Sequence, residues 1–188
     1  MLSPRERNLL WGANLWYFGE GMFGPLLAVF AGQVGGNILD ITYAWAIFLA
    51  VTGVLQIFVG RIADLFAKRQ GREKIMVIGY ALNAFFTFMY LFVHSPTTLF
   101  MVQAGLGVAT ALSSPTWLSL YSDNNKKGAG ATTWGLEAGA SNMIHAVGIV
   151  LGGLIVTRYS FTALFAMMGV TQTIAAIYQA QIIWIKGK

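Results

Sequence analysis

The sequence predicts an all-α integral membrane protein with six transmembrane helices and both termini in the cytoplasm. Hydrophobic residues make up 56% of the 188 residues and charged residues only 10%, whereas soluble domains carry about 25% charged residues. The apolar residues gather in stretches long enough to cross a bilayer, which takes about 20 residues of α-helix. Nearly all of the Lys and Arg residues stand at the ends of these stretches.

Six apolar stretches divide the chain, and short connections that contain Gly, Pro and Asn separate them. We expect transmembrane helices at residues 8–31, 41–64, 74–93, 98–121, 131–157 and 160–185. Because no long polar linker interrupts them, residues 1–188 are expected to form a single domain. Pro25 removes a backbone donor from the first stretch, so we expect that helix to kink near Gly21.

The positive charges predict how the chain is oriented in the membrane. Eleven of the twelve Lys and Arg residues fall on one side of the expected membrane, and only Arg158 falls on the other. Since short cytoplasmic loops are enriched in Lys and Arg, both termini are expected in the cytoplasm, with the chain in the inner or plasma membrane. The same placement accounts for the net charge of +5 without nucleic-acid binding.

The first stretch has two interpretations. Arg5 and Arg7 resemble the basic start of a signal peptide, and Val29-Phe30-Ala31 resembles a cleavage site. However, the apolar stretch is longer than the usual 7–15 residues of a signal peptide, and Glu20 interrupts it. We therefore interpret this stretch as a retained transmembrane helix.

Polar residues inside the apolar stretches are the candidates for function, because an acidic side chain in mid-membrane costs about 2.5–3.5 kcal/mol. At helical spacing, polar or aromatic residues form one stripe on each of the first, fourth and fifth stretches. We expect these stripes to line a water-accessible cavity, with Tyr17, Glu20, Gln103, Trp117, Glu137 and His145 as its substrate or ion residues. For Gln103, Thr110, Ser114 and Ser141, hydrogen bonds between helices are an alternative role.

Glycines on the fifth stretch predict close helix packing, because a residue without a side chain lets another backbone approach. Gly148, Gly152 and Gly153 are the candidates. An enzyme is not expected. Gly139-Ala140-Ser141-Asn142-Met143 approaches a G-x-S-x-G motif but ends in Met143, and His145 would come from the same helix. We expect no cofactor and no metal site, since nucleotide-binding and zinc motifs and cysteines are absent from the sequence.

The connection GRIADLFAKRQGREK, residues 60–74, resembles the signature loop of the major facilitator superfamily, G-x-L-A-D-R-x-G-R-[KR]-x. Its first half is matched by Gly60, Ile62, Ala63 and Asp64, and its second half by Arg69, Gln70, Gly71, Arg72 and Lys74, if residues 65–68 are an insertion. Glu73 stands where a base is usual. The segments QAGLGVA (103–109) and GIVLGG (148–153) are similar to the fourth and fifth helices of the family.

The resemblance implies a specific function. Transporters of this family have twelve helices in two six-helix halves, with the substrate bound between them at mid-membrane, and this chain resembles the N-terminal half. Helices one, two, four and five would line the pathway, and alternating access would move a small molecule. The cytoplasmic gate would be the loop with Gly60, Asp64, Arg69, Gly71 and Arg72, in which Asp64 pairs with the two arginines. Met101 and Ile149 replace an arginine and a proline on which proton coupling and antiport depend in many members.

The expected partners are the lipid bilayer, a small-molecule substrate and a second six-helix half. That half would be the rest of a longer chain of which this one is a fragment, a separate chain or another copy of this one, because six helices cannot close the pathway alone. The alternative is a membrane interaction or assembly protein that derives from such a half and no longer transports.

Overall fold

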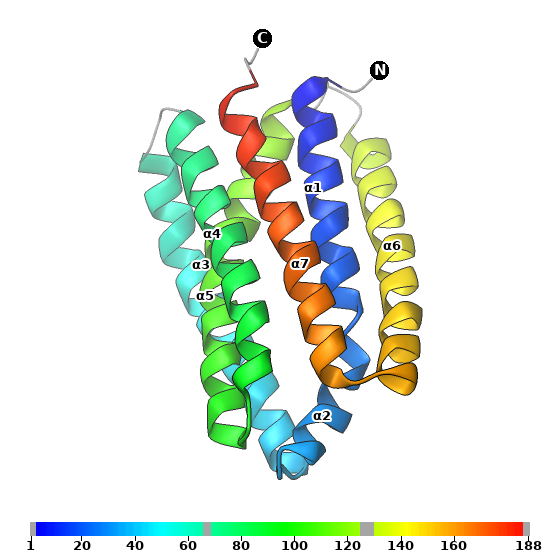
Figure 1. Ribbon diagram of the computed structural model, residues 1–188. Helices are drawn as coiled ribbons and strands as arrows, with labels where there is room; N and C mark the ends of the chain where they lie inside the picture. The colour runs from blue at the N-terminus through cyan, green and yellow to red at the C-terminus, as the bar shows by residue number, and fades with distance from the viewer. Residues whose placement is uncertain (1–2, 66–68, 125–129, 186–188) are drawn as a thin grey trace.

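A serine and a glutamate begin the first helix. In the computed structural model, which describes residues 3–65, 69–124 and 130–185, the Ser3 side chain accepts from the Glu6 backbone N–H, and Glu6 accepts from the Ser3 N–H in return. This capping box satisfies two backbone donors that a helix start leaves open. The regular elements that follow are all helical: α1 (Pro4–Gly21), η1 (Gly24–Leu26), α2 (Leu27–Gln33), α3 (Ile38–Leu65), α4 (Arg69–Met89), η2 (Tyr90–Phe92), α5 (Pro96–Asn124), α6 (Gly130–Arg158), α7 (Phe161–Ala180) and η3 (Gln181–Ile183) (Figure 1).

Five segments in the described part of the chain are long and apolar enough to cross a membrane. They correspond to the second through sixth predicted spans and run over Ile38–Leu65, Gln70–Phe92, Pro96–Asn124, Gly130–Arg158 and Phe161–Ile183. The all-helical membrane architecture is therefore confirmed. The first predicted span corresponds to α1 and α2, and its crossing of the membrane stays a prediction.

Proline breaks the first span where the sequence predicts it. α1 ends at Gly21, Pro25 lies in the 3₁₀ turn Gly24–Leu26, and α2 begins at Leu27. Because Pro25 has no backbone N–H, it cannot continue the hydrogen bonds of α1. The predicted kink is confirmed as a short turn between two helices.

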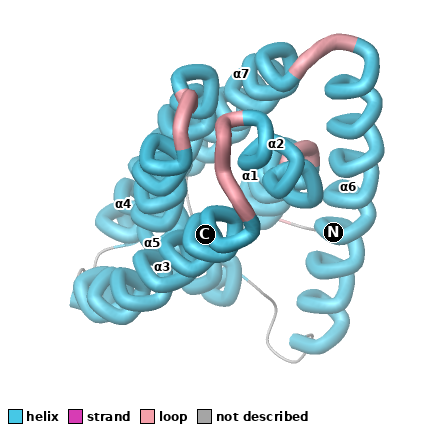
Figure 2. Tube along the Cα trace, turned by 90° about the horizontal axis from the view of Figure 1, so that it is seen from below, coloured by secondary structure: helices cyan, strands magenta, loops and turns pink. Residues whose placement is uncertain are grey.

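The helices form a bundle in which α7 packs against α1 and α4, and α5 against α3 and α4. α6 packs mainly on α1, and α3 mainly on α5, so these two helices stand at the outer sides of the bundle (Figure 2). Both termini lie at one end (Figure 1). The C-terminal end of α6, which carries Arg158, lies at the other. This arrangement agrees with the charge pattern, and the orientation in the membrane remains a prediction.

Two apolar clusters fill the ends of the bundle. Near α2, the rings of Phe23, Phe30, Tyr90 and Phe165 pack together, with Tyr90 stacked on Phe165 at a ring distance of 5.0 Å. Near the termini, Leu9, Met76, Trp117, Leu120 and Ile182 are among the buried residues. Polar side chains occupy the middle of the bundle, between these clusters.

Two of the three predicted packing glycines meet α1. A Cβ atom on Gly148 would lie 2.5 Å from the Phe18 carbonyl oxygen, and one on Gly152 would overlap the Met22 carbonyl oxygen. From the opposite side, a Cβ on Gly21 would lie 2.5 Å from the His145 carbonyl oxygen. For Gly153, nothing in the described structure lies within 4 Å of the Cβ position, so its packing role stays a prediction. Gly153 points away from α1 since it is one residue, about 100° of helix, past Gly152.

Candidate functional site

Two hollows inside the bundle share Glu20 and Thr110 in their linings. The hollow nearer the termini has a volume of about 220 Å³, and its lining includes Tyr17, Glu20, Trp117 and Glu137. The second, of about 70 Å³, is lined by Glu20, Gln103, Trp45, Phe48 and Tyr90 among others. Five of the six predicted pathway residues thus line one hollow or the other.

The helices that line the hollows include those that the family resemblance implies. Apart from Tyr90 of η2, the residues named above come from α1, α3, α5 and α6, and α4 and α7 add Tyr80, Asn83, Thr87 and Gln172. The polar stripe of α5 lies on the inner face because Gln103, Thr110, Ser114 and Trp117 recur at steps of seven, four and three residues. Gly107 of the same stripe has another role, since a Cβ there would lie 2.9 Å from the Phe48 carbonyl oxygen on α3.

Glu20 occupies an unfavourable position on its helix. It lies in the last turn of α1, next to the break at Gly21. The C-terminal end of a helix carries a partial negative charge, so a carboxylate there gains nothing from the helix dipole. An acidic residue that breaks this local rule inside a bundle is a candidate for a functional group.

Glu137 reaches the larger hollow from α6 and is held by a hydrogen bond. The Ser141 hydroxyl, one helical turn further on, lies 3.0 Å from Glu137 Oε1 and 3.4 Å from Asn14 Oδ1. Ser141 therefore bridges its own helix to α1, which is the interhelix role that the sequence left open. Through this contact it also restricts the position of the Glu137 carboxylate.

Trp117 forms a fixed wall of the larger hollow. Its Nε1–H donates to the Leu9 carbonyl oxygen of α1 at 3.1 Å, and its ring stacks on Tyr121 at 4.9 Å. On α1, the Tyr17 ring packs edge-on against the adjacent Trp16 ring, with 5.0 Å between the ring centres. Aromatic faces held in this way offer flat apolar surfaces to a ligand.

His145 does not line either hollow. Its ring is half-buried and lies beside Tyr17, at 6.4 Å between ring centres. The helical spacing places His145 on the face of α6 that packs against α1. It lies one turn further along than Ser141, where Gly21 brings the α1 backbone against the His145 carbonyl.

Three further polar residues line the smaller hollow and are not among the predicted pathway residues. They are Asn83, Thr87 and Gln172. Gln172 does donate to the Trp16 carbonyl oxygen at 3.1 Å, but its Oε1 and Asn83 Oδ1 are buried without a hydrogen-bond partner in the described structure. The third such atom is Thr110 Oγ1, which is also buried without a hydrogen-bond partner in the described structure. Buried polar atoms are nearly always bonded, so these three mark a place suited to water or a polar ligand.

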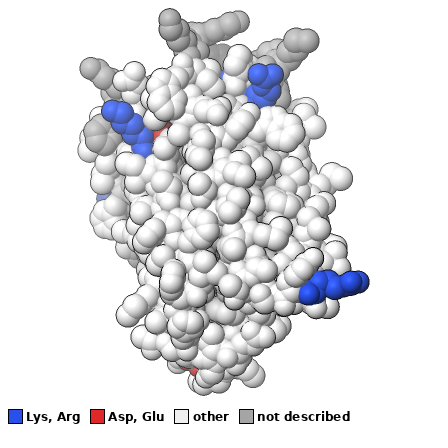
Figure 3. All heavy atoms as spheres, in the orientation of Figure 1, with Lys and Arg blue, Asp and Glu red and all other residues white. Residues whose placement is uncertain are grey.

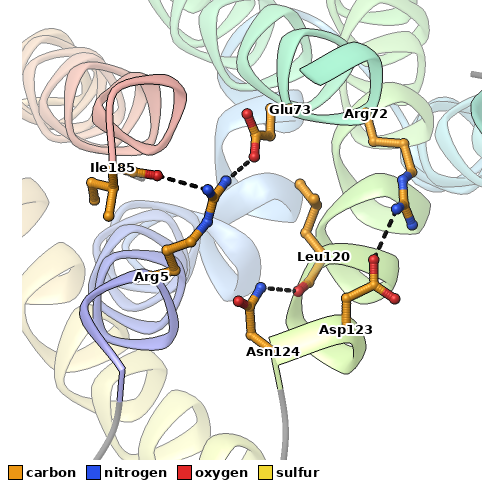
Figure 4. A network of polar contacts seen from close by, with 7 residues as sticks. All are labelled: Arg5, Arg72, Glu73, Leu120, Asp123, Asn124 and Ile185. Atoms are coloured by element: carbon orange, nitrogen blue, oxygen red, sulfur yellow. Dashed lines mark hydrogen bonds and ion pairs between the residues drawn. The ribbon is translucent and has the colours of Figure 1, made fainter. Parts of the chain in front are cut away.

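The predicted gate loop has a different ion pair from the expected one. Arg72 Nη2 lies 2.8 Å from Asp123 Oδ2 of α5 (Figure 4). Arg72 Nη1 donates to Ser119 Oγ at 2.5 Å. The partner of Arg72 is therefore Asp123 and not Asp64, which is exposed in the last turn of α3. The Arg69 side chain lies outside the described residues. Gly60 and Gly71 lie in α3 and α4, so these ends of the expected loop are helical.

A second network at this end was missed by sequence reasoning. Arg5 and Glu73 form a buried ion pair, and Arg5 Nη1 donates to the Ile185 carbonyl oxygen at 2.6 Å (Figure 4). The network joins the start of α1, the start of α4 and the segment after η3. Glu73 stands at a position where the family usually has a base. This departure could have indicated that the acid is paired with a basic residue elsewhere in the chain.

The described residues contain no group of three or more His, Cys, Asp or Glu side chains that could hold a metal ion.

Comparisons with known proteins agree with this architecture. Similar relatives are the multidrug resistance proteins MdtG of Salmonella arizonae, Salmonella paratyphi B and Salmonella newport, each 22% identical over 162 residues. The alignment covers 84% of this chain and 39% of each relative, so the chain spans about two fifths of the length of the curated relatives it matches. The family model described as Major Facilitator Superfamily matches residues 9–186. With nearly its whole length matched, the chain belongs to the major facilitator superfamily.

Proposed function

We propose that this chain forms the N-terminal half of a secondary transporter that moves a small molecule across a membrane by alternating access. The observation that carries the proposal is the pair of hollows that share Glu20 in the interior of the bundle. Polar groups inside membrane helices are costly and usually mark a substrate or ion pathway. Tyr17, Glu20, Gln103, Trp117 and Glu137 would contact the substrate or the coupling ion.

The chain needs a second six-helix bundle to enclose this pathway. Two exposed stripes of small residues favour that partner: Ala46, Ala50 and Gly53 on α3, and Gly135, Gly139 and Asn142 on α6. Small residues let membrane helices approach closely, and the exposed Asn142 amide would find a hydrogen-bond partner there that lipid cannot supply. The greater length of the relatives supports the same partner, which would be part of a longer chain, a separate chain or a second copy.

The lining favours an organic molecule with a flat apolar part and a basic group as the substrate. Trp117 and Tyr17 would pack against the apolar part, and Glu20 or Glu137 would attract the positive charge. The relatives bear the name multidrug resistance protein, which supports this substrate class. We propose export or uptake of such cations without assigning one compound.

The gate would act at the end of the bundle that carries the termini. Arg72 holds the start of α4 to α5 through Asp123 and Ser119, while exposed Asp64 at the end of α3 would face the second bundle. Asp64→Asn should slow transport with little change in substrate binding, because it alters a contact between halves and leaves the hollow intact. Equal loss of binding and transport would argue against this gate.

The test of the main proposal uses cells that express the chain together with its second six-helix half. The double variant Glu20→Gln/Glu137→Gln should lose transport of an aromatic cation such as ethidium, while the amount of protein in the membrane stays the same. Asp40→Asn removes an acid outside both hollows and should transport normally. Full transport by the double variant would show that Glu20 and Glu137 do not form the transport site. If the parent chain forms a stable complex with the second half but the complex moves no substrate, the result would instead favour a membrane interaction or assembly protein that no longer transports.

A further inference from the structure

An apolar groove follows the outer surface of the bundle between α4 and α7. Its volume is about 420 Å³, and its lining includes Val77, Ala81 and Phe88 on α4 and Thr173, Ala176 and Ala180 on α7. The Thr173 hydroxyl already donates to the Gly169 carbonyl oxygen at 2.8 Å, so it needs no partner inside the groove. The groove is separate from the two hollows and shares no lining residue with them.

The groove is about as long as one leaflet of a bilayer. Phe88 follows Val77 by eleven residues on α4. At 1.5 Å per residue this segment spans about 16 Å, which is roughly half of the 30 Å hydrocarbon layer. At the deep end Phe88 packs over Gly169, where a Cβ atom would overlap its ring. A transmembrane helix would need a surface across the whole membrane, so this length suits a single acyl chain better.

The open end of the groove lies at the end of the bundle that carries the termini, beside a base and an aromatic residue. Lys74 is exposed and precedes Val77 by three residues on the same face of α4. Trp184 follows Ala180 by four residues and is 75% exposed. In the described structure the ion pairs engage Arg5 and Arg72 and not Lys74. Figure 3 shows no Lys, Arg, Asp or Glu over the middle of α4 and α7.

We propose that this groove binds one anionic glycerophospholipid from the leaflet on the side of the termini. One acyl chain lies along Val77, Ala81 and Ala176, and the phosphate lies near Lys74. Lysine residues near a membrane surface attract anionic lipids, and tryptophan is enriched at the headgroup level. The apolar groove and its basic end together require a ligand that is apolar over one leaflet and negative at its head. The site does not depend on the transport proposal.

Native mass spectrometry of the purified 188-residue chain in detergent tests the site, with phosphatidylglycerol and phosphatidylcholine added at equal concentration. We expect one retained phosphatidylglycerol molecule in preference to phosphatidylcholine. Lys74→Gln should weaken its binding about fivefold, which corresponds to the ~1 kcal/mol contributed by one lysine at an anionic surface. Ala81→Trp should fill the groove and remove the bound lipid.

Two matched variants serve as controls. Arg158→Gln removes an exposed base at the other end of the bundle, and Ala140→Trp places the same large ring on the exposed side of α6. Both should bind phosphatidylglycerol as the parent chain does. Equal retention of phosphatidylcholine, or unchanged binding after Lys74→Gln, would overturn the proposal.

A photo-reactive amino acid in place of Ala81 gives an independent result if Ala81→Trp does not fold. Irradiation of membranes should attach it to a phospholipid. Attachment to another protein chain instead would assign the groove to a helix and would overturn the lipid site.

Discussion

Gly148 determines how closely α6 approaches α1. A methyl group at this position would lie 2.5 Å from the Phe18 carbonyl oxygen, well inside van der Waals contact, and the oxygen belongs to backbone that cannot rotate away. Gly153 lies in the same helix five residues later, where a methyl group would meet open space. The two glycines therefore have the same helix propensity and opposite packing environments.

Gly148→Ala should destabilise the bundle by about 1–3 kcal/mol, because an extra methyl group in a packed interior forces backbone shifts. Gly153→Ala should be neutral or slightly stabilising, since alanine is the better helix former. The thermal unfolding midpoint of each variant in the same detergent measures the difference. Equal midpoints for the two variants would show that α1 and α6 do not pack as closely as described.

Residue spacing predicted much of the candidate site, because the 3.6-residue period places Gln103, Thr110 and Trp117 on one face of α5 whatever the neighbouring helices do. The same reasoning identified Glu20 and Glu137. It could not identify Asn83 and Gln172 as lining residues. Their role depends on which helices lie opposite them, and spacing within one helix carries no information about that.

The start of α4 is joined to its neighbours by two ion pairs that differ in burial. Arg5 and Glu73 are both buried, and Arg5 also bonds the Ile185 carbonyl oxygen, so this pair connects α1, α4 and the end of the chain described here. The pair between Arg72 and Asp123 is partly open to solvent, with the Asp123 side chain 46% exposed. Removal of one partner disrupts a buried ion pair only in the first case.

Glu73→Gln should therefore cost about 3–5 kcal/mol of stability, as expected when one member of a buried ion pair is removed. Asp123→Asn should cost less than about 1 kcal/mol, as for exposed pairs. Urea unfolding in detergent, followed by helical circular dichroism, compares the two variants. A cost for Asp123→Asn as large as that for Glu73→Gln would contradict the difference in burial.

The course of the individual helices was largely predictable and their pairing was not. Pro25 predicts the break between α1 and α2 because proline acts locally. The pairing of Arg72 with Asp123 joins residues more than fifty positions apart, and the sequence favoured nearby Asp64 instead. The third predicted span also begins earlier than expected, since α4 starts at Arg69 and the sequence predicted residue 74.

The two ends of the whole molecule are formed by different parts of the chain. The termini, the end of α3 and the start of α4 lie together, and the turns that follow α2 and α6 lie at the far end (Figure 1). The membrane class follows from composition, since 56% hydrophobic residues in so long a chain exceed what a water-soluble surface tolerates. The side of the membrane on which each end lies comes from the positive-inside rule alone.

Cysteine labelling tests this orientation directly, because the chain contains no cysteine. In right-side-out vesicles, a membrane-impermeant maleimide should react with Asn37→Cys and Tyr159→Cys, which are both exposed at the far end. Gln70→Cys, exposed at the end with the termini, should react only after the vesicles are opened. Labelling of Gln70→Cys and Asn37→Cys from the same side would contradict a bundle that crosses the membrane in this way.

The glycines of α6 also limit how the bundle can deform. The carbonyl oxygens of Phe18 and Met22 rest on Gly148 and Gly152. A slide of α6 by one turn would bring the Met22 oxygen against Val156 in one direction, or the Phe18 oxygen against Ile144 in the other. The two helices are therefore locked in register and must tilt as a unit. α1 shares far fewer contacts with α5 than with α6, so the space around Glu20 can widen between α1 and α5, with the Trp117–Leu9 hydrogen bond as the fixed point.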